Sequence, residues 1–334
     1  MKLFSVLSVV LVFCILTNSR LSLSYAAAGL ELWLQKMVPT LLPFSILSGV
    51  MVRMRLTEKV AMLVYPLLHP FFRVRKNVCY AMLMGFLCGF PMGARVVGEL
   101  YGEGLITIRE AEYLLAFCNN IGPVYFCGFV LPLLGRQLFL PYLFGMYGIP
   151  LLYGLLLRYT AFRDIGEQPA CQQLAGKQPG KRQPAHKKSG SGQLVCCEQE
   201  AEGFQEAFSF LEALDDSIAE AGRGILMLGG YMVLFNLLNL LPHLLLGRSS
   251  VLFAPLLEIS GGLNGLQQSF PLYSLLAVSF GGLSCIAQTY SCIRETGLSI
   301  AVYIRRKLLQ TLLTGGFYGC WFLASGFLHC SFLA

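Results

Sequence analysis

Five polar residues interrupt apolar stretches of this sequence at positions where a membrane helix would bury them: Arg95, Asn119, Asn120, Ser284 and Gln288. Arg95 is followed four residues later by Glu99, a spacing that places both side chains on one face of a helix. A guanidinium can grip a carboxylate with two hydrogen bonds, which suggests a contact to an anionic solute. The alternative is an interfacial loop over 95–110, with Arg95 reaching lipid headgroups. We favour that alternative.

The two adjacent amides Asn119 and Asn120 stand just before Gly122-Pro123. Buried amides need hydrogen-bond partners, and the proline ring clashes with the carbonyl four residues earlier. This combination predicts a helix break. We favour a role for both amides in binding a solute or ion over a role in satisfying the kinked backbone.

Ser284 and Gln288 follow Gly281-Gly282 and would share one face of a helix. Their hydroxyl and amide groups suit either contact to a solute or hydrogen bonding between helices. Both interpretations stay open. Glu258, flanked by Leu257 and Ile259, is either a proton or cation site or an interfacial acid, and we favour the interfacial acid.

Glycine and proline mark two matching interruptions of the apolar sequence. The first contains Gly89, Pro91 and Gly93, and the second contains Gly281 and Gly282. These residue types break helices, and broken helices line the substrate sites of many transporters. Close helix packing through small residues is the alternative, and neither is preferred.

The elements that must position these residues are membrane helices. Of the 334 residues, 55% are hydrophobic and 13% are charged, whereas a soluble domain carries about 25% charged residues. Uncharged runs cover 37–52, 77–94, 113–135, 137–157, 224–247, 259–293 and 308–334. A spanning helix needs roughly 20 mostly apolar residues. The run at 259–293 is too long for one span, and its glycines and proline predict two pieces joined by a turn.

The chain divides into four segments: a transmembrane helix or signal-like segment over 1–28, a first membrane half over 29–162, a flexible basic linker over 163–203 and a second membrane half over 204–334. We favour a helix for the first segment. The linker is rich in lysine, arginine, proline and glycine, which predicts a cytoplasmic position.

The two halves share a pattern. Gly282 lies 193 residues after Gly89, and an alanine, a Gly-Leu pair and a leucine recur at the same offset. The sequence therefore predicts an all-α, polytopic integral membrane protein built from two related halves, an inverted repeat with broken or re-entrant helices. Duplicated halves of this kind are typical of secondary transporters.

Other classes of function have no support in the sequence. It contains no paired carboxylates at hydrolase spacing, no GxSxG, no phosphate loop, no HExxH and no nucleic-acid-binding motif. The cysteines and histidines show no metal spacing. We expect no enzyme activity, no catalytic residue, no metal, no cofactor and no nucleic acid.

The order of the motifs resembles the YlbJ family of sporulation integral membrane proteins, also called SpoVV, over about 29–160 and 204–315. The matching motifs are Gly29-Leu30-Glu31-Leu32-Trp33, Pro39-Thr40-Leu41-Leu42-Pro43-Phe44, Gly89-Phe90-Pro91-Met92-Gly93-Ala94, Glu110-Ala111-Glu112, Leu114-Leu115, Asn119-Asn120, Gly282-Leu283-Ser284 and Ala287-Gln288. The family is similar to the nucleoside-recognition or gate group, which is related to concentrative nucleoside transporters. The linker over 163–203 does not match the family pattern.

The resemblance implies transport of dipicolinic acid during sporulation, across the outer forespore membrane that faces the mother cell. Our candidate substrate-binding residues are Gly89, Pro91, Gly93, Arg95, Asn119, Asn120, Gly282, Ser284 and Gln288. The expected partners are a small anionic solute and the lipid bilayer. A coupling ion, homo-oligomers and association with other sporulation membrane proteins stay open. The alternatives are a nucleoside-like solute, or a non-transporting scaffold for assembly of the spore envelope.

Overall fold

The computed structural model describes residues 2–165 and 198–325, and within these ranges it contains helices and no strand. Four helical segments are long and apolar enough to cross a membrane: Ser19–Arg53, Arg136–Tyr159, Phe210–Leu246 and Pro271–Ile293. Large apolar side chains such as Leu63, Leu245 and Leu312 are more than two-thirds exposed, as expected for a surface that faces lipid rather than water. The prediction of an all-α, multi-pass membrane protein is confirmed.

The described part of the N-terminal segment and of the first half together contains twelve α-helices: α1 (Lys2–Thr17), α2 (Ser19–Leu32), α3 (Val38–Arg53), α4 (Thr57–Ala61), α5 (Tyr65–Phe72), α6 (Lys76–Cys88), α7 (Met92–Gly102), α8 (Ile108–Phe117), α9 (Pro123–Tyr125), α10 (Leu131–Leu134), α11 (Phe139–Leu143) and α12 (Ile149–Tyr159). Single π-helical turns join α2 to α3, α9 to α10 and α11 to α12 without ending the helical path. The helix therefore runs through residue 28, the expected boundary of the N-terminal segment.

The second half contains α13 (Glu198–Leu238), α14 (Leu240–Leu246), α15 (Ala254–Leu257), α16 (Ile259–Leu266), α17 (Pro271–Phe280), α18 (Gly282–Ile293) and α19 (Ile300–Ala324). Because α13 begins at Glu198, the last residues of the expected linker are helical. Most of that linker, 166–197, lies outside the described residues. The relation between the two halves stays a prediction.

Two of the expected helical runs are divided further than the hydropathy indicated. The run 113–135 is not one span, because α8 ends at Phe117 and α9 begins only at Pro123. The run 259–293 forms α16, α17 and α18, with the expected turn before Pro271 and a second interruption at Gly281. In both runs a glycine or proline stands at the interruption, and these residues weigh little in a hydropathy average.

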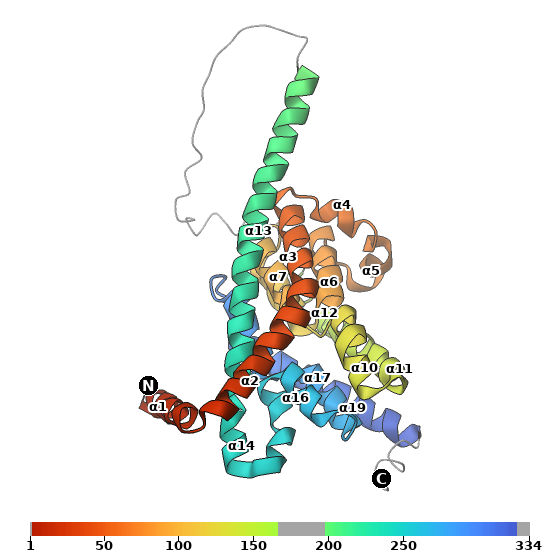
Figure 1. Cartoon of the computed structure of the whole chain (residues 1–334). Coiled ribbons are helices and arrows are strands. Elements are labelled where there is room, and N and C mark those ends of the chain that lie inside the picture. Colours follow the sequence, from red (N-terminus) through yellow and green to blue (C-terminus); the bar gives the residue numbers. More distant parts are fainter. Residues whose placement is uncertain (1, 166–197, 326–334) are drawn as a thin grey trace.

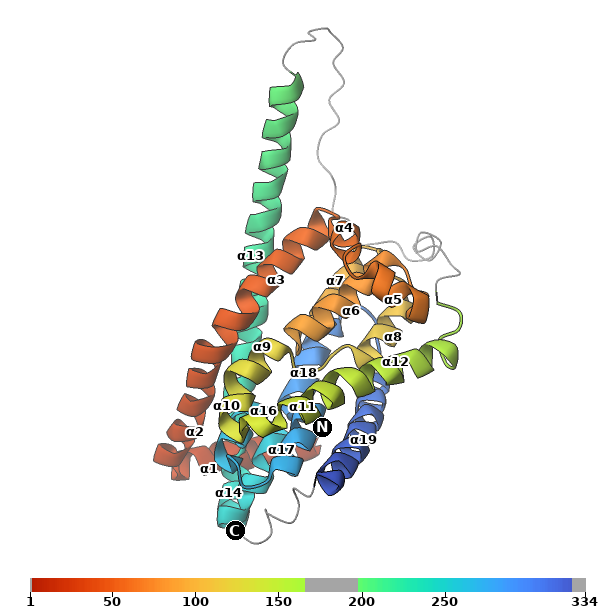
Figure 2. The same ribbon diagram turned by 90° about the vertical axis from the view of Figure 1, so that its right-hand side faces the viewer.

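The long helix α13 lies beside α2 and α3, which cross it in the opposite chain direction (Figures 1 and 2). Helices α4 and α5 lie at one end of the molecule, and α14 lies at the other. Two buried apolar clusters fill the body. One reaches Cys118 and the other begins at Ile121. The interruption between α8 and α9 therefore lies where the two cores meet.

The start of α8 is fixed by local polar contacts. Thr107 and Glu110 form a capping box, and Arg75 donates to the buried Glu110 carboxylate. A capping box satisfies two backbone N–H groups that the first helical turn leaves free. These contacts position the C-terminal end of α8, where Asn119 and Asn120 follow.

Candidate functional site

The first helix break is a crossing of two extended segments. Gly89 pairs with Ile121 in an isolated antiparallel bridge, and the backbone N–H of Phe90 donates to the carbonyl of Asn120 at 2.8 Å. Gly89 has φ +77°, and a Cβ built there would lie 2.2 Å from the backbone nitrogen of Gly122. Only glycine permits both this conformation and this approach. The break before α7 is thus held against the break after α8.

Asn119 and Asn120 face a polar cluster contributed by the second half. Asn119 donates to Thr289 at 2.9 Å and to Tyr303 at 3.1 Å. The Asn120 oxygen accepts from the Lys307 ammonium at 2.9 Å and also from Gln310. Both asparagines are at most 2% exposed. Their amides connect α8 to α18 and α19.

The second break lies directly beside the first. Gly281 and Gly282 have φ values of +85° and +77° at the start of α18. A Cβ built on Gly281 would lie 2.8 Å from the ring of Phe90. Within α18, Gln288 donates to Ser284 at 2.8 Å. The two predicted interruptions therefore meet in space.

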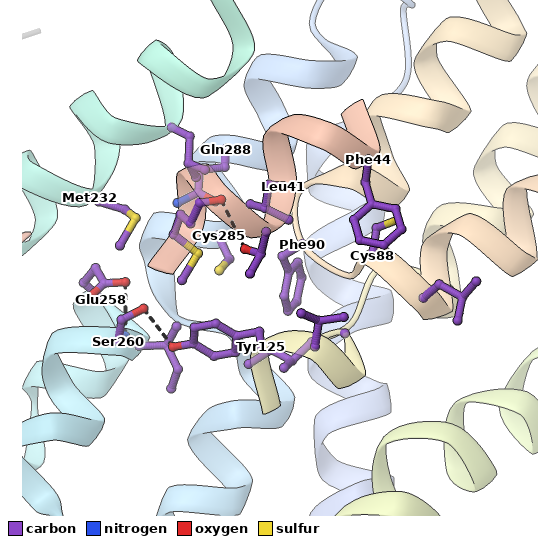
Figure 3. Close-up of a pocket in the computed structure, with 18 residues that line it drawn as sticks. Leu41, Phe44, Cys88, Phe90, Tyr125, Met232, Glu258, Ser260, Cys285 and Gln288 are labelled. Atoms are coloured by element: carbon purple, nitrogen blue, oxygen red, sulfur yellow. Dashed lines mark hydrogen bonds between the residues drawn. The ribbon is translucent and has the colours of Figure 1, made fainter. Parts of the chain in front are cut away.

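A small central cavity of about 50 Å³ lies between α3, α13 and the two breaks. Its lining includes Phe90, Tyr125, Glu258, Ser260 and Gln288 (Figure 3). This volume holds a few water molecules at most. The rest of the lining is mainly apolar, from residues such as Leu41, Phe44 and Met232. The cavity is a small, mostly apolar compartment with a few polar groups at its wall.

Among the residues that the structure describes, Glu258 is the one acidic side chain that lines the central cavity, and no basic side chain lines it. It caps α16: its carboxylate accepts from the backbone N–H groups of Ser260 at 3.1 Å and Gly261 at 2.7 Å, and from the Asn236 amide at 3.1 Å. The residue is 2% exposed. The interpretation of Glu258 as an interfacial acid is therefore wrong, because the carboxylate is enclosed and held by three donors.

A much larger cavity, the vestibule, opens beside Arg95 between α3, α7, α13 and α18, with a volume of about 870 Å³. It has charged residues of both signs in its wall: Arg53, Arg95, Glu99, Glu103, Asp216, Glu220, Arg223, Arg294 and Glu295. Arg95 lies inside α7 and pairs with Glu99 at 2.7 Å. The loop interpretation of 95–110 is wrong for its first part, because the helix continues to Gly102.

On the other side of the central cavity lies a third hollow of about 410 Å³, here called the outer cavity, lined by α2, α13 and α16. Its lining includes Glu31, Lys36, Asn236 and Gly261. Asn236 and Gly261 are also the donors to Glu258. The carboxylate thus stands at the wall between the central and the outer cavity.

The three cavities follow one another along the same helices. On α13, residues 216–231 line the vestibule, Leu228 and Met232 line the central cavity, and Asn236 lines the outer cavity. From Asp216 to Asn236 the helix rises about 30 Å, at roughly 1.5 Å per residue, close to the ~30 Å of a hydrocarbon core. The order on α2 and α3 is the reverse: 25–36, then 37–44, then 49–53.

Three of the nine candidate residues line these cavities. Pro91 and Arg95 line the vestibule, and Gln288 lines both the vestibule and the central cavity. The other six line none of the three cavities: Gly89, Gly93, Asn119, Asn120, Gly282 and Ser284. Within the described ranges, no three His, Cys, Asp or Glu side chains gather as metal ligands.

Sequence reasoning missed Tyr125 and Lys307. Tyr125 lies just after the Gly122-Pro123 break, and its hydroxyl bonds Ser260 at 2.8 Å. Lys307 stands beside the apolar run 308–334 and follows two arginines, so it reads as a helix flank. The one feature of the sequence that could have drawn attention to Lys307 is its position directly before a long apolar run. The partner that makes it notable, Asn120, is 187 positions away.

The Arg95–Glu99 pair gives a test of stability. Arg95 and Glu99 are 12% and 14% exposed, and each leaves one polar atom without a hydrogen bond among the described residues. Arg95→Met should lower the free energy of unfolding by about 3 kcal/mol, because it leaves a buried carboxylate unpaired. The double variant Arg95→Met/Glu99→Gln should recover most of this loss in thermal unfolding measured in detergent.

The matched control for this pair is Arg294→Met. Arg294 lines the same vestibule, but its partner Glu295 is 84% exposed. An exposed pair contributes about 0–1 kcal/mol. Equal losses from Arg95→Met and Arg294→Met, or a double variant no better than Arg95→Met, would contradict the buried pairing.

One of the comparisons with known proteins finds a relative of the kind that the motifs resemble. No family model matches the chain, and no solved structure matches it. Over 116 residues, 35% of this chain, it is 32% identical to the sporulation integral membrane protein YlbJ of Bacillus subtilis strain 168. The match spans 28% of the length of that relative. This similarity covers about a third of the chain and agrees with the resemblance to the YlbJ family that the motifs carry.

Proposed function

We propose that this protein is a membrane transporter that moves a small carboxylated solute along the three cavities, and that dipicolinic acid is the solute during sporulation. The observation that carries the transporter proposal is the series of vestibule, central cavity and outer cavity, which share or adjoin lining residues. The similarity to a sporulation integral membrane protein supports a membrane role in sporulation.

The constriction at the central cavity favours a carrier over an open pore. A volume of about 50 Å³ admits a few waters and no dicarboxylate. For a solute to pass, the helices on one side of the central cavity (α13, α2 and α3) must move away from the two helix breaks on the other side. Glycines in both breaks and short helices around them are the elements that permit such a change in backbone angles.

The charges along the path set a condition on an anionic solute. The vestibule has four arginines and five acidic residues in its lining, and the Arg95 guanidinium has one buried nitrogen without a hydrogen-bond partner among the described residues. The central cavity offers only Glu258 as a charged lining group, whose carboxylate three donors already hold. A dianion therefore needs its charge balanced on entering, by protons or by an accompanying cation.

A specific observation supports the nucleoside-like alternative. Tyr125, Ser260, Glu258 and Gln288 present hydroxyl, carboxylate and amide groups at an otherwise apolar wall. Such groups suit the hydroxyls and ring nitrogens of a neutral solute as well as those of a carboxylic acid. The third alternative, a non-transporting scaffold, gives no role to the three cavities.

The vestibule end is the end we assign to the cytoplasm. It carries Arg53, the α3–α4 connection next to it holds Arg55, and α4 holds Lys59. Cytoplasmic loops carry an excess of lysine and arginine. With this orientation the vestibule collects solute from the mother cell if the protein lies in the outer forespore membrane.

The experiment is flux of labelled dipicolinate into proteoliposomes that contain the purified full chain. We expect protein-dependent flux above that of protein-free liposomes, and competition by other small dicarboxylates. Competition by nucleosides at lower concentrations than by dicarboxylates would favour the nucleoside-like solute. Absence of any protein-dependent flux of either class, with or without proton and sodium gradients, would contradict transport and favour the scaffold.

A further inference from the structure

The side chain of Lys307 reaches from α19 into the break of the first half. Its ammonium donates to the backbone carbonyl of Asn119 at 3.0 Å and to the side-chain oxygen of Asn120 at 2.9 Å. It also lies 4.6 Å from the centroid of the Phe90 ring. Lys307 is 1% exposed. A lysine so deeply enclosed in a membrane protein needs a reason beyond solubility.

The partners of this ammonium are all groups that bind cations. An ammonium has three donors and no acceptor, and here it meets one carbonyl oxygen, one amide oxygen and one aromatic face. No Asp or Glu of the described ranges lies within ion-pair distance of Lys307. The positive charge is balanced by dipoles rather than by a carboxylate.

The position in the fold adds a second reason. Asn119 follows directly after α8, whose C-terminal end carries the negative pole of the helix dipole. In transporters with broken helices, unwound carbonyls and the C-terminal ends of half-helices coordinate the coupling cation. Asn119 also keeps a buried side-chain oxygen with no hydrogen-bond partner among the described residues. The segment therefore presents several oxygens of the kind that bind a small monovalent cation.

We propose that Lys307 is a resident cation: its ammonium fills a place at the first break that a free monovalent cation would otherwise bind. The lysine side chain connects the second half to the first, and no free ion has to bind and dissociate at this place. The consequence for transport rests on the proposed function: solute movement needs no sodium at this position.

The test measures thermal unfolding of the full chain in detergent, in chloride salts of sodium, ammonium, potassium and choline at equal ionic strength. Lys307→Ala should lower the unfolding temperature by about 10 °C in choline. Sodium or ammonium should restore part of this loss with saturation, because only the folded state binds the cation. Lys307→Met should be destabilised without rescue, because its side chain fills the space.

The control is Arg305→Ala on the same helix, where the side chain is exposed. The unfolding temperatures of Arg305→Ala and of the unsubstituted protein should each be the same in the four salts. Absence of cation-specific rescue in Lys307→Ala would overturn the inference. If that variant does not fold, the unsubstituted protein decides: saturable stabilisation by sodium over choline would overturn the inference, and indifference to the cation would support it.

Flux separates this inference from the proposed function. In proteoliposomes, equal dipicolinate flux in sodium and choline media supports the resident cation. A requirement for sodium contradicts it when the unsubstituted protein is also stabilised by sodium over choline in the unfolding test, because a sodium ion that only accompanies the solute needs no site in the solute-free protein. Absence of flux in every medium contradicts the proposed transport function. In that case the unfolding measurements in the four salts decide whether Lys307 acts as the resident cation.

Discussion

Gly89→Ala should abolish accumulation of the folded protein, whereas Gly297→Ala should not. The two glycines have nearly the same φ, +77° and +76°, so both substitutions give an alanine a positive φ. A positive φ alone costs an alanine about 1–2 kcal/mol, and Gly89 has ψ −159° in addition, a combination that is essentially confined to glycine. At Gly297 the added Cβ meets no atom within 4 Å, but at Gly89 it lies 2.2 Å from the Gly122 nitrogen. The clash cannot be relieved by a side chain, because both segments are backbone.

The measurement is the yield of monodisperse protein and its unfolding temperature in detergent. We expect a cost above about 4 kcal/mol for Gly89→Ala, in the range that marks a broken core contact. Comparable yields and unfolding temperatures for the two variants would show that the crossing of the two breaks does not hold the fold together.

Gln288→Leu should lower solute flux by about tenfold or more while the protein stays folded. Gln288 is the polar side chain that lines both the vestibule and the central cavity. A hydrogen bond to a charged group contributes about 1.5–3 kcal/mol, and 1.4 kcal/mol corresponds to a tenfold change. The lost bond to Ser284 should cost only about 1 kcal/mol of stability.

The matched control is Gln137→Leu, the same chemical change at an exposed glutamine that lines none of the three cavities. It should leave flux unchanged. Flux and unfolding temperature are measured on the same preparations. Wild-type flux in a folded Gln288→Leu variant would contradict a solute path that passes the junction of the vestibule and the central cavity.

The sequence contained the signals for the breaks and for part of the lining. Glycine and proline at 89–93 and 281–282 predicted interruptions, and the structure places them in contact. The spacing of Arg95 and Glu99 predicted a shared helix face, which the ion pair confirms. These features are local, so residue type and spacing along the chain carry them.

The remaining features depend on contacts between distant parts of the chain. Lys307 meets Asn120 across the two halves, and Asn236 meets Glu258 from another helix. Hydropathy assigned 113–135 to one span because it averages over the Gly122-Pro123 break. The cavities themselves arise from how α13 crosses α2 and α3, which no short motif records. The solute-binding role predicted for Asn119 and Asn120 stays a prediction.

The most direct test of a solute path through the vestibule uses the native thiol of Cys292. This residue lines the vestibule and is partly exposed. Flux is measured before and after treatment with a small anionic methanethiosulfonate, in the unsubstituted protein and in Cys292→Ser, which keeps every other cysteine. Our account predicts loss of flux only where Cys292 is present, with protection by dipicolinate. Equal flux after treatment in both proteins, with labelling of Cys292 verified by mass, would contradict it.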